Sequence, residues 1–287
     1  MKKSFVLLFM IITPFLMFSQ DLDEFFSSSE DKDKEPVSVT FLGERIGNGP
    51  SVEVPGKNEL NLIISHRFGR IDGGFYELFG LDDATMRMGF DYGITDRFAV
   101  GIGRSSLLKT FDFYLKYKIL NQAKNGSPIS LALYSSLNHI SQLRYFQGDN
   151  DNFIDRSGMS LLLPIARKFG DFMALQITPA WQRNIYVPEL GEGTDIYALG
   201  AGLRVKLSHR VHFTGEYFHL LKTPYSERYS PLTLGFDLDT GGHLFQLVFS
   251  NSQGMTEKTY LADTRGKWQD KEIYFGFNLI RVFYLNN

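Results

Sequence analysis

Short segments in which apolar and polar residues alternate strictly are the feature that most limits what this chain can fold into. In the clearest one, residues 111–119, Phe111, Phe113 and Leu115 alternate with Asp112 and Lys116. Successive side chains of a β-strand point to opposite faces, so the pattern predicts a strand with an aromatic face and a charged face. About twelve such segments occur, mostly of roughly the ten-residue length of a tilted membrane strand. We expect strands near residues 60–68, 86–93, 98–103, 111–119, 129–139, 157–167, 172–182, 196–207, 211–220, 231–238, 243–251 and 271–284.

The connections between these segments alternate in length. Compact turns are expected at 94–97, 121–128, 168–171, 208–210 and 239–242, and longer connections at 69–84, 140–156, 183–195, 221–230 and 252–270, with 106–110 as a brief exception. Outer-membrane barrels have short periplasmic turns and longer external loops. The chain is therefore predicted to be all-β, a closed antiparallel transmembrane β-barrel of about 12 strands. A soluble β-sandwich is the alternative, but it would not explain the asymmetry of the connections.

The residues before the first strand divide into two parts. Residues 1–20 have two lysines, an apolar run from Phe5 to Phe18, and Ser19-Gln20, which predicts a signal peptide cleaved near Ser19 or Gln20. Within residues 21–58, residues 21–36 form a charged, serine-rich lead-in that we expect to be disordered. Residues 37–58 are rich in Gly and Pro and have order only if something packs on them, either in the lumen or at its periplasmic mouth. We therefore treat residues 21–58 as a possible plug and 59–287 as the barrel domain.

Charge and cysteine content exclude several classes of protein. The formal net charge of -2 does not resemble that of a nucleic-acid binder. The absence of cysteine excludes a lipoprotein anchor, disulfides and thiolate metal sites. We expect the protein in the outer membrane of a Gram-negative bacterium. The expected partners are the lipid bilayer and the barrel assembly machinery, with an unknown protein partner as a further candidate. We expect no cofactor.

Several longer motifs resemble a known family. They include residues 65–69 (SHRFG), 79–82 (FGLD), 90–97 (FDYGITDR), 101–106 (GIGRSS), 115–118 (LKYK), 241–246 (GGHLFQ) and 274–278 (YFGFN). Together they resemble a Bacteroidetes family of uncharacterised outer-membrane β-barrel proteins, over roughly residues 40–284. The resemblance implies the location and the fold, and it supplies no catalytic residues, because the family carries a domain-of-unknown-function label.

Enzymatic and metal chemistry find little support in the sequence. Ser135 and His139 share the apolar face of one predicted strand, but four residues span ~13 Å, too far for a nucleophile and its base. No Gly-x-Ser-x-Gly motif occurs. We therefore expect no enzyme and keep a membrane-embedded lipid hydrolase only as a minor alternative. Asp149, Asp151 and Asp155 form a weak calcium candidate, because their loop lacks the glycine and terminal glutamate of an EF-hand.

The predicted inward face carries the remaining candidates. If the apolar face contacts lipid, charged residues of both signs project into the lumen, and the lumen or solute-binding candidates are Arg67, Arg87, Asp91, Lys116, Lys118, Arg204, Glu216 and Asp237. They indicate either a passive channel or solute-binding barrel, or an ion-pair network that fills a non-conducting, structural or partner-binding barrel. Small residues such as Gly101, Gly103, Gly200 and Gly202 predict local open space, available to water, a solute or residues 37–58.

Overall fold

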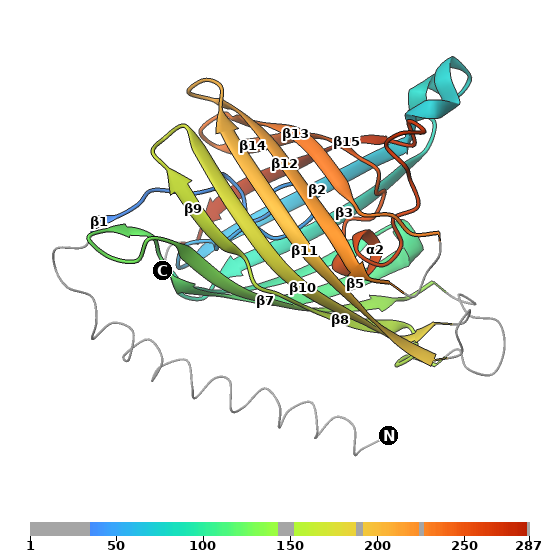
Figure 1. Cartoon of the computed structure of the whole chain (residues 1–287), viewed down its shortest axis with the longest axis horizontal. Helices are drawn as coiled ribbons and strands as arrows, with labels where there is room; N and C mark the ends of the chain where they lie inside the picture. The colour runs from blue at the N-terminus through green and yellow to red at the C-terminus, as the bar shows by residue number, and fades with distance from the viewer. Residues whose placement is uncertain (1–34, 143–151, 188–191, 224–226, 286–287) are drawn as a thin grey trace.

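The computed structural model describes residues 35–142, 152–187, 192–223 and 227–285, and within them a closed barrel of 12 antiparallel strands. The strands are β2 (Glu59–Arg70), β3 (Ala84–Gly93), β4 (Phe98–Ser105), β5 (Thr110–Leu120), β7 (Ser130–Ile140), β8 (Ser157–Leu162) with β9 (Ile165–Phe169), β10 (Met173–Val187), β11 (Glu192–Lys206), β12 (Val211–Lys222), β13 (Leu232–Asp239), β14 (His243–Ser250) and β15 (Tyr274–Tyr284). Pairing of β15 with β2 closes the barrel, which removes the exposed sheet edge. The predicted fold class is confirmed (Figure 1).

One predicted strand is divided in two. Residues 157–167 were expected to form a continuous strand, but β8 and β9 are separated at Leu163 and Pro164 and together occupy one position between β7 and β10. Proline has no backbone N–H and cannot donate to a ladder, which accounts for the interruption. The chain then recovers its pairing with β10 as far as Phe169.

The alternation of faces follows the prediction. On β5, Phe111 and Phe113 are 45% and 43% exposed, whereas Asp112 and Lys116 on the opposite face are 2% and 1% exposed. The apolar side chains therefore cover the outer surface and the charged ones line the interior. This is the arrangement of a barrel surrounded by lipid.

Shorter elements lie in the connections. They are η1 (Ile71–Gly80), η2 (Leu107–Lys109), α2 (Glu257–Tyr260) and a two-stranded sheet of β1 (Glu35–Pro36) with β6 (Ala123–Lys124). Short turns gather at one end of the barrel, the turn end, where β1 also lies. The longer connections, including η1, gather at the other end, the loop end. No helix among the described residues has the length and apolarity needed to cross a membrane.

The N-terminal predictions have mixed outcomes. Residues 1–20, the expected signal peptide, and residues 21–34 of the lead-in lie outside the described residues. The prediction of disorder as far as residue 36 is wrong at its end, because Glu35 and Pro36 pair with Lys124 and Ala123 as strand β1. These two residues are ordered because their backbone pairs with β6, in the turn between β5 and β7. Their composition alone did not predict this.

Candidate functional site

A hairpin formed by residues 40–53, here called the luminal segment, lies inside the barrel. All of its residues from Thr40 to Val52 except Leu42 are buried. Arg45 and Pro50 form a bridge, and the Ile46 N–H donates to Gly49 O at 3.0 Å across the tip. Asn and Gly favour such tight reversals, which explains why the sequence Gly47-Asn48-Gly49 turns here.

The barrel wall binds the tip of this hairpin. The Glu216 carboxylate accepts from the N–H groups of Asn48 at 2.6 Å and Gly49 at 3.0 Å. Arg67 Nη2 donates to Asn48 Oδ1 at 2.8 Å, and Asn278 Nδ2 donates to Gly47 O at 3.0 Å. Two of the predicted candidates, Arg67 on β2 and Glu216 on β12, are thus brought together on one backbone turn.

Two predicted lysines on β5 bind the arms of the hairpin. Lys116 Nζ donates to Glu44 O at 3.1 Å, and Lys118 Nζ forms an ion pair with Glu53 at 2.9 Å. Glu53 also accepts from the Thr40 N–H at 2.7 Å. Four of the eight candidates therefore contact the luminal segment directly.

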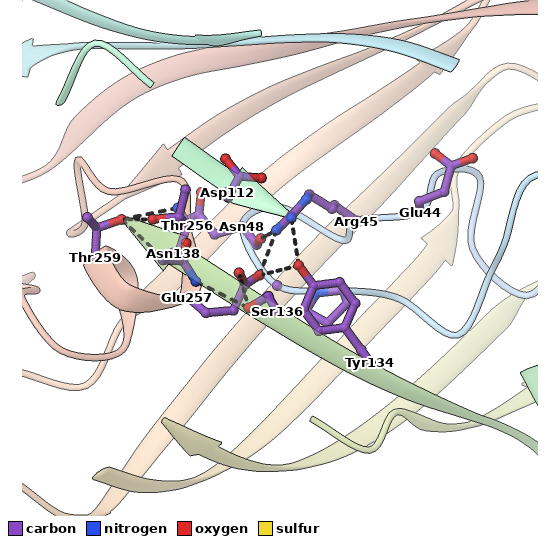
Figure 2. A network of polar contacts seen from close by, with 12 residues as sticks. Glu44, Arg45, Asn48, Asp112, Tyr134, Ser136, Asn138, Thr256, Glu257 and Thr259 are labelled. Atoms are coloured by element: carbon purple, nitrogen blue, oxygen red, sulfur yellow. Dashed lines mark hydrogen bonds and ion pairs between the residues drawn. The ribbon is translucent and has the colours of Figure 1, made fainter. Parts of the chain in front are cut away.

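A second internal segment meets the first at the centre of the barrel. Residues 251–264, the inner loop, enter from the loop end and contain α2, on which Glu257 is fully buried. Its carboxylate forms an ion pair with Arg45 of the luminal segment at 3.1 Å and accepts from Tyr134 Oη at 3.0 Å and Ser136 Oγ at 3.1 Å (Figure 2). Arg45 also donates to Tyr134 Oη at 3.1 Å. The network therefore joins the two internal segments to each other and to β7.

The start of α2 explains how Glu257 is placed. Thr256 precedes the helix, and its N–H donates to Thr259 Oγ1 at 3.1 Å in a capping box. Such a cap satisfies backbone groups that a short buried helix would otherwise leave unpaired. The cap fixes the first turn, from which Glu257 reaches Arg45.

The other four candidates lie on the wall without a hydrogen bond or ion pair to the luminal segment. Arg87 Nε donates to Asp112 at 2.9 Å, which makes a buried ion pair between β3 and β5. Asp91 is fully buried and lies near the Tyr114 hydroxyl and Arg87. Asp237 accepts from Gln246 Nε2 at 3.1 Å, whereas Arg204 lies on the luminal face of β11.

The expectation of space beside small residues is wrong at Gly101, Gly103 and Gly200, where side chains of the wall fill it, and is confirmed at Gly202, where residues 37–58 occupy it. A Cβ at Gly101 would overlap the Tyr114 ring, and one at Gly103 would overlap Arg87. At Gly200 it would meet Phe218, and at Gly202 it would meet Ile46 of the luminal segment. Large side chains from neighbouring strands and the hairpin fill these places, because a glycine lets them lie flat against the wall.

The residues that the sequence analysis missed belong to the internal segments. Arg45 and Asn48 lie in a region read only as Gly- and Pro-rich, and Glu257 lies in one read as an external loop. Neither segment has the period of a strand or a long helix. The only local signals were the turn residues around Asn48 and the Thr256–Thr259 cap, and neither indicates which barrel wall the segment contacts.

Ser135 and His139 do not form a hydrogen-bonded pair. Ser135 and His139 both lie on the outer face of β7, and the partner of His139 Nδ1 is instead Ser157 Oγ, at 3.0 Å. The Ser157 hydroxyl also donates to Phe153 O at 2.9 Å. A serine nucleophile would instead have to give this proton to the histidine.

Metal binding is not supported either. Two of the three calcium candidates, Asp149 and Asp151, lie outside the described residues, and Asp155 accepts from Asn152 Nδ2 at 2.5 Å. Across the described ranges, no group of three or more His, Asp or Glu side chains is placed to hold a metal ion.

Comparisons with known proteins agree with this architecture. A family model described as "Membrane bound beta barrel domain (DUF5777)" matches residues 41–283. The NanC porin structure has 8% identity over 79% of this chain and 100% of its own, with a TM-score of 0.50. An outer membrane channel from Pseudomonas putida F1 has 15% identity over 80% and 97% of the two chains, with a TM-score of 0.45. At 8% identity the likeness to the NanC porin shows the fold alone. A search of curated proteins found no match. That the family is one of Bacteroidetes, as the resemblance of the motifs implied, stays a prediction.

Proposed function

The chain belongs to the family of membrane-bound β-barrel domains (DUF5777), and from this premise we propose that it is an outer-membrane channel for small solutes, closed by its own luminal segment. The single observation that carries the proposal is the placement of residues 40–53 inside the barrel, bound by Arg67, Lys116 and Glu216. The family match covers residues 41–283, so it includes nearly all of the hairpin as well as the barrel.

The contacts between the hairpin and the wall support a closed state from which the channel can open. Most bonds that hold the hairpin are hydrogen bonds and ion pairs, which can be exchanged for bonds to water at a net cost of about 0.5–1.5 kcal/mol for each hydrogen bond. Its buried apolar side chains, Phe41, Ile46 and Val52, face the small side chains of Ala132, Ala166 and Ala174. Departure of the hairpin would leave a space between the polar wall and the inner loop, which can hold water.

The main alternative is a permanently closed barrel with a structural or partner-binding role. The Arg45–Glu257 contact favours it, because separation of the two internal segments would leave a buried charge on each side. The outcome of the following experiment distinguishes the two functions. Neither proposal includes an enzymatic step.

The test is single-channel conductance in a planar bilayer. We expect a variant lacking residues 21–58 to give steady, ion-selective openings and the full chain to open rarely. A second variant, G47C/T233C, keeps the hairpin and tests closure without a deletion: an ideal Cβ at Gly47 lies 3.3 Å from Thr233 Cβ, close to the roughly 3.5–4.5 Å that a disulfide spans. The chain has no other cysteine.

The oxidised G47C/T233C barrel should never open, and dithiothreitol should restore the rare openings of the full chain. Silence from the deletion variant, in protein shown to be folded and inserted, would rule out the channel. Free conductance through the oxidised barrel would show that the hairpin does not close it.

Export by a signal peptide cleaved near Ser19 or Gln20 is part of the proposal. N-terminal sequencing of the protein recovered from outer membranes tests it. A mature chain that begins at Gln20 or Asp21 is expected, and one that still begins at Met1 would contradict cleavage.

A further inference from the structure

Four basic side chains gather on the luminal wall near the turn end, apart from the central network. They are Lys168 on β9, Arg204 and Lys206 on β11, and His212 on β12, here called the basic luminal patch. Strand pairing places them together: Lys168 and Arg204 both pair with Ala174 of β10, and Lys206 pairs with His212. Lys168, Arg204 and His212 are each less than 9% exposed.

Carboxylates lie around the patch, but only Asp171 forms an ion pair with one of its members. Lys168 forms an ion pair with the exposed Asp171 at 3.1 Å and donates to Ser38 Oγ at 2.6 Å. Asp237 pairs with His212 across the strands, but its carboxylate accepts from Gln246. Within the described part of the chain, no carboxylate lies at ion-pair distance from Arg204 or Lys206, and Asp237, Glu53 and Asp171 attract Arg204 only from farther away. Arg204 and Lys206 therefore keep N–H donors that no carboxylate binds directly.

Two of its polar atoms are buried without a partner. Arg204 Nε and His212 Nδ1 make no hydrogen bond to any described residue. An unsatisfied buried polar atom is costly, more so on a charged group, and such atoms in a native protein usually have a water or an ion beside them. Beside a guanidinium that no carboxylate binds directly, an anion supplies both an opposite charge and a hydrogen-bond acceptor, whereas water supplies only the acceptor.

We infer that the basic luminal patch binds a small oxyanion of the phosphate class, alone or as part of a solute. The planar guanidinium of Arg204 presents paired N–H donors that match the oxygens of a phosphate, and Lys168 and Lys206 supply further positive charge. The inference deepens the proposed channel function, on which it rests for the route that the anion takes. Binding itself does not require the hairpin to leave.

The test is titration of inorganic phosphate into the full-length barrel in detergent at low ionic strength, followed by calorimetry and by the midpoint of thermal unfolding. We expect R204Q to bind phosphate about tenfold more weakly or not at all, because it loses a charge-assisted pair of hydrogen bonds. Phosphate should raise the unfolding midpoint of the parent chain and leave that of R204Q unchanged. K206Q, at a half-buried position that tolerates substitution, should weaken binding by a few-fold.

R281Q is the matched control, because Arg281 lies near the same end of the barrel on the outer face, over the Phe283 ring. It should bind phosphate like the parent chain. Equal binding by the parent, R204Q, K206Q and R281Q, or no binding by the folded parent, would overturn the inference. The titration uses the closed, full-length chain and is independent of the conductance test. Absence of phosphate binding with a conducting deletion variant would overturn only the anion site. Phosphate binding without conductance in any variant would overturn only the channel.

Discussion

Single residues in the lumen strongly affect the stability of the folded barrel, because charged side chains are buried there in contact with one another. Arg45 and Glu257 are 5% and 0% exposed, and each has the other as its ion-pair partner. Inside a protein the attraction of such a pair mainly offsets the cost of removing both charges from water. Loss of one member of the pair is therefore expected to lower the free energy of unfolding far more than replacement of both members.

Substitution of Glu257 tests this directly. E257Q keeps the shape and some of the hydrogen bonds but leaves the Arg45 charge uncompensated, so we expect it to lower the free energy of unfolding by roughly 3–5 kcal/mol. The double variant R45M/E257Q should be less destabilised than the sum of the two single variants. Urea unfolding in lipid vesicles measures both. E35Q, which breaks the exposed Glu35–Lys124 pair, is the control and should have no measurable effect. Strictly additive effects would mean that the buried pair is not coupled.

Gly101 allows a second test at the same scale. A Cβ at this position would overlap the buried Tyr114 ring, which cannot move freely because it packs against Tyr134 with ring centroids 5.0 Å apart. We expect G101A to lower the free energy of unfolding by about 1–3 kcal/mol. In the turn between β13 and β14, Gly242 has open space around its Cβ position, so G242A should be neutral. Equal stability of the two variants would show that Tyr114 does not lie over Gly101.

At the scale of elements, each strand carries two surfaces that meet different surroundings. Met88 and Phe90 of β3 are exposed on the outer face, while Arg87 and Asp91 on the other face are buried. The outer face must therefore be apolar where the bilayer core surrounds it and can be polar near the ends of the strand.

Arginine substitutions along β3 test the membrane contact. M88R, near the middle of the strand, should lower the free energy of unfolding by about 2–4 kcal/mol, and A84R, at its loop end, by about 0–1 kcal/mol. Urea unfolding in vesicles of one lipid composition gives both values. If the two variants lost the same stability, the outer face of β3 would not lie in lipid.

At the scale of the whole molecule, the barrel and the hairpin stabilise each other. Arg67, Lys116 and Glu216 all bind the luminal segment, so its removal leaves these wall residues with fewer partners. Water that enters the lumen would replace part of what is lost. The closed molecule should thus be more stable than the open barrel, although both keep the 12-strand wall.

Deletion of residues 21–58 should therefore lower the midpoint of urea unfolding and also reduce the dependence of the unfolding free energy on urea, because less surface becomes exposed on unfolding. A deletion of residues 21–34 alone is the control and should leave both quantities unchanged. An unchanged midpoint after the longer deletion would indicate that the hairpin is not bound inside the barrel.

The amino-acid sequence determined the wall of this protein. Alternation along segments such as residues 111–119 assigned Asp112 and Lys116 to the lumen and Phe111 and Phe113 to the outside, because a strand has a period of two whatever its neighbours are. The same pattern placed all eight candidates on the luminal face. It missed the break at Pro164, since one proline can either end a strand or interrupt it.

Only the tertiary structure decided what fills the lumen. Asn48 meets Arg67 and Glu216 across sequence separations of 19 and 168 residues, and Arg45 meets Glu257 across 212. Such contacts depend on closure of the barrel and on the length of each connection, and no local period records them. The strands could be predicted from the sequence because their surroundings alternate with every residue. The hairpin and the inner loop could not, because the wall that encloses them determines their conformation.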